Sequence, residues 1–327
     1  MISFEELGCT PHFEGAYQQV LKKAEHAQEL SLGRVTSLDR GYPLVNTADG
    51  EYRAELATVI KKSEDSIVAV GDWVALRRPA EHEKAIIEAV LERSVEIARV
   101  KRVGREKQIR RQVLAANVDL VLICQSLTGE GLDLRLGMRQ IAAVRGCGAE
   151  AVFVLTKCDA VDKTVVDDAV STLGQVAPDV PVVQLATAAE QGVENVRALC
   201  EADKTVLLLG ESGVGKSTLV NALLGQEALE TGAVREADDK GRHTTVARRM
   251  LQIPGGGLMI DAPGLRTLQL IDVERSLEAT FPDIIELAYE CKFSDCSHTH
   301  EPGCAVRDAV NQRRLESYFN LRDYKNR

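Results

Sequence analysis

Residues 210–218 have the residue types and spacing of a phosphate-binding loop. The pattern GxxxxGK[ST] is met in full by Gly210, Glu211, Ser212, Gly213, Val214, Gly215, Lys216 and Ser217, followed by Thr218. In such a loop, backbone N–H groups surround the phosphates, the lysine reaches the β- and γ-phosphates, and the serine hydroxyl binds Mg²⁺. We therefore predict that these residues bind a nucleotide, that Lys216 also assists catalysis and that Ser217 binds magnesium. The loop alone does not distinguish GTP from ATP.

A second acidic motif follows the loop along the chain. Asp261 ends a strand-forming segment and begins the sequence Asp-Ala-Pro-Gly, which fits the pattern DxxG. We expect Asp261 to hold Mg²⁺ through water and the N–H group of Gly264 to contact the γ-phosphate. Either Thr244 or Thr245, in the polar segment between the two motifs, is expected to close on Mg²⁺ when the γ-phosphate is present.

The group that would position the attacking water is harder to identify. Many GTPases place a glutamine directly after the DxxG motif, where this chain has Leu265. His243 precedes the two threonines and is the internal candidate for catalysis, because an imidazole can act as a general base or orient water. The alternative is that His243 only shapes this segment or contacts a partner.

A third motif, Thr156-Lys157-Cys158-Asp159, follows an apolar strand-forming segment and fits the guanine-reading pattern [NT]KxD. Guanine offers two adjacent donors, N1–H and the N2 amino group, and one carboxylate accepts from both, whereas N1 of adenine is an acceptor that a carboxylate repels. Asp159 is therefore the predicted guanine selector. Lys157 is expected to lie along the base or to support the phosphate loop, and Thr156 completes the predicted base site. The alternative is an ordinary strand followed by a polar turn.

The order of these motifs is unusual. GTPases normally carry the phosphate loop first and the base-reading motif last, whereas here the base-reading motif comes first. A circular permutation relates the two orders. Sites in a parallel sheet lie at the carboxyl ends of its strands, so the motifs converge whatever the connections between strands. We therefore predict a circularly permuted P-loop GTPase domain that binds GTP or GDP together with Mg²⁺.

Three of the eight cysteines lie near the C-terminus beside two histidines. Cys291, Cys296 and Cys304, with either His298 or His300, form a Cys₃His set, which is a normal complement for one structural Zn²⁺. Zinc would rigidify a segment that is too short to bury a core of its own. The alternative is that these cysteines are free thiols in a small helical tail.

The patterns of apolar residues divide the chain into four regions. Residues 1–30 form an extension with one amphipathic helix. Residues 31–100 contain short strand-forming segments separated by turns, which predicts an OB-type β-barrel, although an SH3-like barrel fits the same periodicity. Residues 101–285 alternate strands and helices, as in a doubly wound α/β sheet. Residues 286–327 form a helical module that carries the zinc ligands.

The net charge of −9 argues against binding nucleic acid through the overall charge of the chain. Segment 99–113 is nevertheless basic, with seven Lys and Arg residues against one Glu. It is either a contact for RNA phosphates or a solvated linker or helix face. No apolar stretch reaches the length of a transmembrane helix, and the first residues do not resemble a signal peptide. We therefore expect a cytoplasmic protein that does not bind membranes.

Together the motifs resemble the family of circularly permuted GTPases called ribosome small-subunit-dependent GTPase A, also known as RsgA, YjeQ or YloQ. The resemblance spans about residues 32–320 and is carried by "VGDWV", "AANVDLVLI", "LTKCD", "GESGVGKSTLVNAL", "GRHTT", "DAPGLR" and "CKFSDCSHTHEPGCAV". It implies an OB barrel and a zinc site that uses His298. It also implies a GTPase that binds the small ribosomal subunit, acts late in subunit maturation, and is stimulated by the subunit. We expect a monomer that contacts the rRNA of this subunit.

The chain departs from the family pattern at Thr156, where an asparagine is usual. Loss of that amide, which ties the base pocket together, is expected to weaken guanine binding without abolishing it. Three other functions stay open: a permuted GTPase that acts on another RNA or ribosomal particle, a metabolic P-loop kinase or ATPase, and a non-catalytic RNA-binding switch. Equal competition by ATP would favour the kinase or ATPase.

Overall fold

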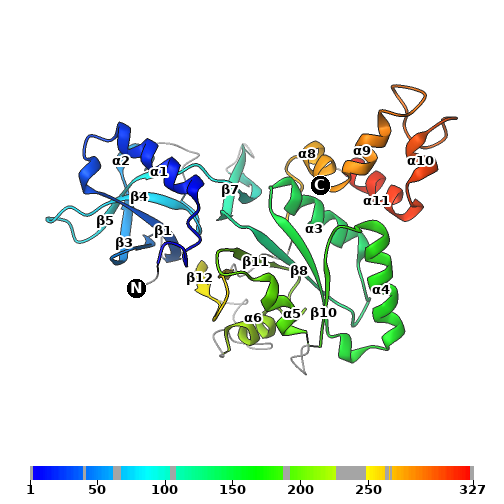
Figure 1. Ribbon diagram of the computed structural model, residues 1–327, viewed down its shortest axis with the longest axis horizontal. Coiled ribbons are helices and arrows are strands. Elements are labelled where there is room, and N and C mark those ends of the chain that lie inside the picture. The colour runs from blue at the N-terminus through cyan, green and yellow to red at the C-terminus, as the bar shows by residue number, and fades with distance from the viewer. Residues whose placement is uncertain are drawn as a thin grey trace. The chain divides into compact units, whose positions relative to one another are not determined.

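The computed structural model describes residues 3–39, 42–61, 68–103, 108–186, 192–225, 248–261, 265 and 267–324 (Figure 1). The chain divides into two compact units. The first unit comprises Met1–Val121, Val193–Leu208 and Lys216–Leu265, and the second comprises Leu122–Gly192, Leu209–Gly215 and Arg266–Arg327. Among the described helices, none combines the length and the apolar character needed to cross a bilayer.

Five strands of the first unit form a closed barrel. They are β1 (Leu30–Asp39), β2 (Tyr42–Thr47), β3 (Gly50–Leu56), β4 (Trp73–Arg77) and β5 (Ala85–Val90), with the short helix α2 (Thr58–Lys61) after β3. Their order is β1-β2-β3-β5-β4, β3 and β5 run parallel, and pairing of β1 with β4 closes the barrel. This is the strand order of an OB fold, so the pairing decides between the two barrel types that periodicity allowed.

Side chains that alternate along the strands fill the barrel, among them Val35, Val45, Val74 and Ile87. Outside this core, helix α1 (Pro11–Lys23) and the short 3₁₀ helix η1 (Ala27–Glu29) precede β1. Phe13 of α1 stacks on the fully buried Trp73 of β4, with ring centroids 5.7 Å apart. The N-terminal extension is therefore packed onto the barrel through its apolar face.

The basic segment folds as an antiparallel hairpin of β6 (Glu96–Val103) and β7 (Gln108–Ala116). Lys101 lies opposite Arg110 in the register. The alternative of a helix face is therefore wrong, because the described residues of this segment form strands. An isolated hairpin is only marginally stable, but here Val113 and Ala116 at its base are buried with Ala69. Such tertiary support is invisible in the local sequence.

The rest of the first unit contains strands of the α/β sheet. Strands β11 (Thr205–Leu209) and β13 (Leu258–Asp261) are parallel, and β12 (Arg248–Gln252) pairs antiparallel with β13. Helices α5 (Val193–Leu199) and α6 (Lys216–Leu224) belong to the same part of the chain. Strand β12 also pairs with β1, with Arg249 opposite Ser37 and Arg248 opposite Leu38. One edge of the barrel is thereby hydrogen-bonded to the α/β sheet.

The second unit carries the other strands and the C-terminal helices. Its strands, in the order β10-β9-β8, are β10 (Val182–Leu185), β9 (Glu150–Thr156) and β8 (Leu120–Ser126). Strands β9 and β10 are parallel, and β8 and β9 are buried along nearly their whole length, as strands covered on both faces are. The helices are α3 (Leu134–Gly146), α4 (Lys163–Val176), α8 (Val273–Thr280), α9 (Pro282–Ala288), α10 (Ala305–Ala309) and α11 (Gln312–Arg322).

The buried side chain of Arg314 fastens α11 to the rest of the second unit. Its guanidinium donates to both carboxylate oxygens of Asp283, at 2.8 and 2.5 Å, and these hydrogen bonds lower the pKa of Asp283. It also donates to the carbonyl oxygens of Val176 at the end of α4, at 2.6 Å, and of Thr280 at the end of α8, at 3.2 Å. One planar cation thus holds α4, α8, α9 and α11 together.

Replacing Arg314 by methionine keeps an apolar stem but removes every one of these hydrogen bonds. Because a carboxylate and buried carbonyl oxygens lose their partner, we expect the free energy of unfolding to fall by about 3 kcal/mol. Urea denaturation measures this change. Arg313→Met is the matched control, since the neighbouring Arg313 is exposed and, among the described residues, its guanidinium donates to the hydroxyl of Thr172 alone. Equal losses in both variants would contradict this role of Arg314.

Candidate nucleotide site and metal centre

The phosphate loop leaves β11 and enters α6, whose first residues are Lys216 and Ser217. Its glycines are required by the backbone: Gly210 has φ +151°, Gly213 +79° and Gly215 +100°. A Cβ atom on Gly210 would lie 2.4 Å from the carbonyl oxygen of Cys124 in β8. A strand, a glycine-rich turn and a helix start are the arrangement in which N–H groups converge on phosphates.

The hydroxyl of Thr156 connects the base-reading motif to this loop. Thr156 is the last residue of β9 and is fully buried. Its Oγ1 lies 2.6 Å from the carbonyl oxygen of Val214 in the loop and 3.2 Å from that of Gln125 in β8. A hydroxyl has one proton to donate, and the shorter contact is the stronger hydrogen bond. The threonine therefore supplies in part the tie that was expected to be missing without asparagine.

The other residues that were predicted to read the base lie just beyond Thr156. Lys157 adopts the left-handed conformation, with φ +57°, and the short 3₁₀ helix η2 (Cys158–Ala160) follows it. Asp159 within this turn is exposed, as a residue that reads a bound base must be before the base arrives. The second unit thus brings Thr156, Lys157 and Asp159 to the same strand end that is tied to the phosphate loop.

In the first unit, Asp261 ends β13 beside the strand that enters the loop. Leu207 of β11 lies opposite Ile260, so Asp261 is level with the residue after Leu207, close to the carboxyl end of β11. Leu265, in the position where a water-orienting glutamine would be expected, is buried and apolar. His243, Thr244, Thr245 and Gly264 lie outside the described residues, so their predicted roles stay predictions.

The C-terminal cysteines and one histidine form a cluster that could hold a zinc ion. One ligand atom from each of Cys291, Cys296, His298 and Cys304 lies within 4.8 Å of the others. Nδ1 of His298 is 3.6 Å from Sγ of Cys291 and 3.5 Å from Sγ of Cys304, and the two sulfurs are 3.9 Å apart. Tetrahedral zinc with ordinary bond lengths places sulfur about 3.6 Å from nitrogen and about 3.8 Å from a second sulfur.

His298 rather than His300 belongs to this cluster. His298 is buried, whereas His300 is exposed and its Nδ1 contacts the hydroxyl of Thr299 at 2.8 Å. Glu301 supports the turn that carries His298, because its carboxylate accepts from the hydroxyl and the N–H group of Ser297. These bonds hold the pKa of Glu301 well below its usual range. Nothing in the local sequence marks Glu301 as part of the centre.

The comparisons with known proteins agree with this arrangement. The model of the family described as RsgA GTPase matches residues 90–271, which is more than half of the chain. The chain belongs to the RsgA GTPase family. A relative from Streptomyces coelicolor, "Small ribosomal subunit biogenesis GTPase RsgA", is 41% identical over 301 residues, covering 90% of this chain and 80% of the relative.

Two crystal structures share the fold. YjeQ from Thermotoga maritima has a TM-score of 0.68 and 23% identity, covering 90% of this chain and all of that one. YloQ, described as a circularly permuted GTPase, has a TM-score of 0.66 and 20% identity, covering 93% of this chain and 99% of that one. The prediction of a permuted P-loop GTPase fold with an N-terminal OB-type barrel and a C-terminal cysteine and histidine module is thus confirmed.

Replacing Thr156 by valine preserves the shape of the side chain and removes the hydroxyl. Because the loop then loses its tie to β9, we expect GDP to bind about fivefold more weakly, the factor for one typical buried hydrogen bond. Equilibrium titration with a fluorescent GDP analogue measures this change, and Thr156→Ser, which keeps the hydroxyl, is expected to bind like the wild type.

Thr280→Val is the matched control for this variant. Thr280 is equally buried, and its Oγ1 donates to the carbonyl oxygen of Ser276 at 2.6 Å within α8, which carries no nucleotide motif. If Thr280→Val weakened GDP binding as much as Thr156→Val, the effect would reflect lost stability rather than a lost tie to the loop.

Proposed function

We propose that this protein is a GTP hydrolase that binds the small ribosomal subunit, acts in its late maturation, and hydrolyses GTP faster when the subunit is bound. The observation that carries the proposal is the contact between Thr156 and Val214, because it ties a guanine-reading motif to a phosphate loop within a member of the RsgA GTPase family. The names of the curated relatives support the small subunit as the partner.

The nucleotide contacts follow from the chemistry of each group. The N–H groups of residues 210–215 and the ammonium group of Lys216 would bind the phosphates, and Lys216 would offset the charge that develops on the γ-phosphate during transfer. Asp159 would accept hydrogen bonds from guanine, with Lys157 beside the base. Ser217 and, through water, Asp261 would hold Mg²⁺, which neutralises phosphate charge when it is bound.

The attacking water needs a partner that Leu265 cannot supply. We propose His243 for this role, with Gly264 at the γ-phosphate and either Thr244 or Thr245 at the magnesium ion. An imidazole can accept a proton from water or hold it in line with the γ-phosphate. Contact of the subunit with His243 would account for stimulation by the partner.

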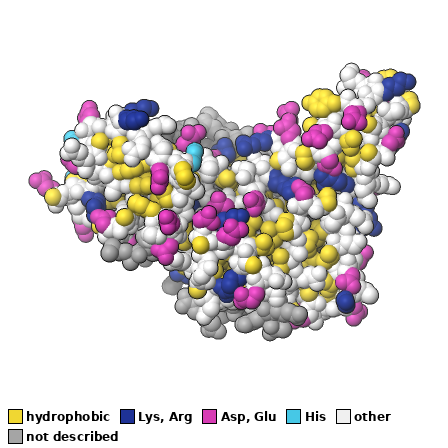
Figure 2. All heavy atoms as spheres, in the orientation of Figure 1, with side chains coloured by type: hydrophobic (Ala, Val, Ile, Leu, Met, Phe, Trp, Pro, Cys, Tyr) yellow, Lys and Arg dark blue, Asp and Glu magenta, His cyan; other side chains and the backbone are white. Residues whose placement is uncertain are grey.

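The rRNA contacts would come from local rather than overall charge. On the face shown in Figure 2, acidic and basic side chains of the described residues are interspersed rather than gathered by sign, in keeping with the net charge of −9. The β6–β7 hairpin concentrates seven cations in its sequence. A barrel of the OB type beside it would offer a second surface for RNA. We expect a monomer that works in the cytoplasm, where ribosomal subunits mature.

Phosphate release from GTP and ATP, with and without purified small subunits, tests the proposal. We expect slow release from GTP alone and a rise of about a hundredfold or more when subunits are added, a range known for partner-stimulated GTPases. Asp159→Asn should weaken GTP binding about a hundredfold, because it removes a charge-assisted pair of hydrogen bonds.

Asp162→Asn is the control, since Asp162 is an exposed carboxylate three residues further on that makes no capping hydrogen bond to α4. Equal hydrolysis of ATP, or GTP hydrolysis that subunits leave unchanged, would contradict the proposed substrate or partner respectively.

We further propose that Cys291, Cys296, His298 and Cys304 hold one structural Zn²⁺. We expect about one zinc per chain by elemental analysis, and Cys304→Ser should lose the metal and lower the unfolding temperature. Cys200→Ser is the control, because Cys200 is as buried as Cys304 but lies outside the cluster. Purified wild-type protein that contained no zinc and gained no stability from added zinc would refute this assignment.

A further inference from the structure

The side chain of Arg34 lies where four segments of the first unit meet. Arg34 belongs to β1 and is 1% exposed. Its guanidinium donates to the carbonyl oxygens of Leu7 in the N-terminal extension, of Gly71 before β4 at 3.3 Å, and of Asn117 after the hairpin at 3.2 Å. It also donates to Oγ1 of Thr205 at 2.8 Å, which is the first residue of β11.

Burial of the Arg34 guanidinium costs free energy, and a purely structural role does not require a charged group here. Among the described residues no carboxylate forms a salt bridge with Arg34, so its direct contacts are hydrogen bonds to carbonyl and hydroxyl oxygens and a cation–π contact with Trp73, whose ring centroid lies 5.4 Å away. Burial lowers its pKa to about 10, although the more distant Asp119 and Asp72 oppose this change. An apolar side chain of similar size is often at least as stabilising at such a position. The guanidinium adds geometric specificity, because its donors lie in a fixed plane and each hydrogen bond forms only when its acceptor is in place.

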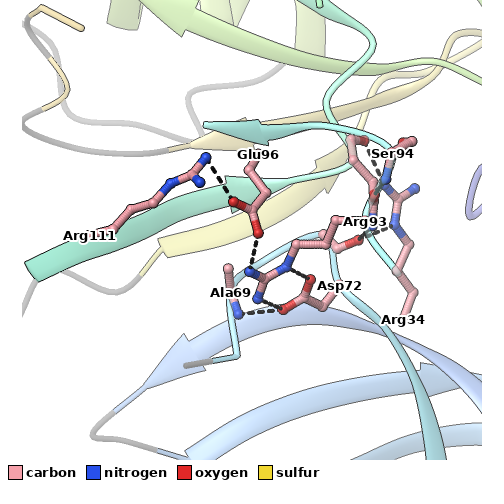
Figure 3. Close-up of polar contacts among 9 residues, drawn as sticks. Arg34, Ala69, Asp72, Arg93, Ser94, Glu96 and Arg111 are labelled. Atoms are coloured by element: carbon pink, nitrogen blue, oxygen red, sulfur yellow. Dashed lines mark hydrogen bonds and ion pairs between the residues drawn. The ribbon is translucent and has the colours of Figure 1, made fainter. Parts of the chain in front are cut away.

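Further contacts hold the junction of the four segments around Arg34. Asn117, with φ +54°, donates its side-chain amide to the carbonyl oxygen of Gly71 and accepts from the N–H group of Ser94. Figure 3 shows Arg93 between Asp72 and Glu96, at 2.6 and 2.7 Å, with Arg111 of the hairpin on the other carboxylate oxygen of Glu96. The barrel and the hairpin are therefore joined by hydrogen-bonded ion pairs.

Among the described residues, β11 meets this junction at its first residue, Thr205. Thr205 accepts from Arg34 through its hydroxyl, and its N–H group donates to a carboxylate oxygen of Asp119 at 2.7 Å. Five residues further on, the same strand reaches Gly210 and the phosphate loop. Thr205 is therefore the point at which a movement of the barrel could reach the strand that leads to the loop.

We propose that Arg34 is a positioning residue that fixes the start of β11 relative to the barrel, and that stimulation of GTP hydrolysis by the small subunit depends on this connection. The inference rests on the proposed function, because it assumes that the barrel and the hairpin bind the partner. It assigns to Arg34 no contact with the nucleotide, so hydrolysis without the partner should be nearly unaffected.

Thr205→Val is the sharpest variant, because it removes one hydrogen bond of Arg34 and leaves the bonds within the barrel in place. We expect hydrolysis without subunits and the affinity for GDP to stay within about twofold of wild type, while the stimulation by saturating subunits falls about fivefold, the factor for one typical buried hydrogen bond. Arg34→Lys, which cannot reach all the acceptors at once, should lower the stimulation further. Thr36→Val is the matched control, because the Thr36 hydroxyl contacts only acceptors in β2.

Hydrogen exchange separates this inference from the proposed function. In Thr205→Val and Arg34→Lys without any partner, amides of β11 should exchange about fivefold faster than in wild type or Thr36→Val. If exchange in β11 is unchanged, Arg34 does not fix the strand and the inference fails even where subunits stimulate the wild type. If exchange rises but the stimulation is intact, the positioning is real but the coupling is not. A wild type that subunits do not stimulate would overturn the proposed function and the coupling, while the exchange result would still decide the positioning.

Discussion

The first unit depends on one buried guanidinium group. Arg34 sits where the N-terminal extension, the barrel, the end of the hairpin and the start of β11 come together, and its hydrogen bonds reach all four. Desolvating a cation costs free energy, and hydrogen bonds to several carbonyl groups must offset this cost. The balance is favourable only when every acceptor is in place, so the group stabilises one arrangement of the segments over nearby alternatives. Glycine at position 8 belongs to this constraint: its φ is +74°, and a Cβ atom there would lie 2.8 Å from Nη1 of Arg34.

In the second unit, a neutral hydroxyl group has a comparable role at the predicted nucleotide site. A single hydroxyl proton on Thr156 is placed between two carbonyl oxygens, one in the phosphate loop and one at the end of β8. The free energy of this hydrogen bond is small compared with that of the surrounding hydrophobic core, but the bond constrains the geometry of the site. It sets how far the turn that carries Asp159 can move from the loop, and a nucleotide that binds both is held more tightly when that distance is already correct.

The sequence predicted the parts of the site that depend on local spacing. The loop, the strand that ends at Asp261 and the Cys₃His set are each contained in fewer than 20 residues, so the sequence alone indicates their chemistry. The barrel was predicted only as one of two types, because periodicity shows which residues are buried but not which strands pair. The hairpin, Arg34 and Glu301 were missed or misread for one reason: their roles are fixed by partners that are distant in sequence or by a turn that has no recognised pattern. Arg34 and Thr205, for example, are 171 positions apart.

The barrel has two different attachments to the α/β sheet. One is covalent, since the chain passes from the barrel through the hairpin into β8. The other is the pairing of β1 with β12, which leads in turn to β13 and Asp261. The segment between the phosphate loop and the DxxG motif includes His243 and leads into Arg248, a residue that pairs with the barrel. A partner that holds the barrel therefore holds one end of the segment that is proposed to complete the catalytic site.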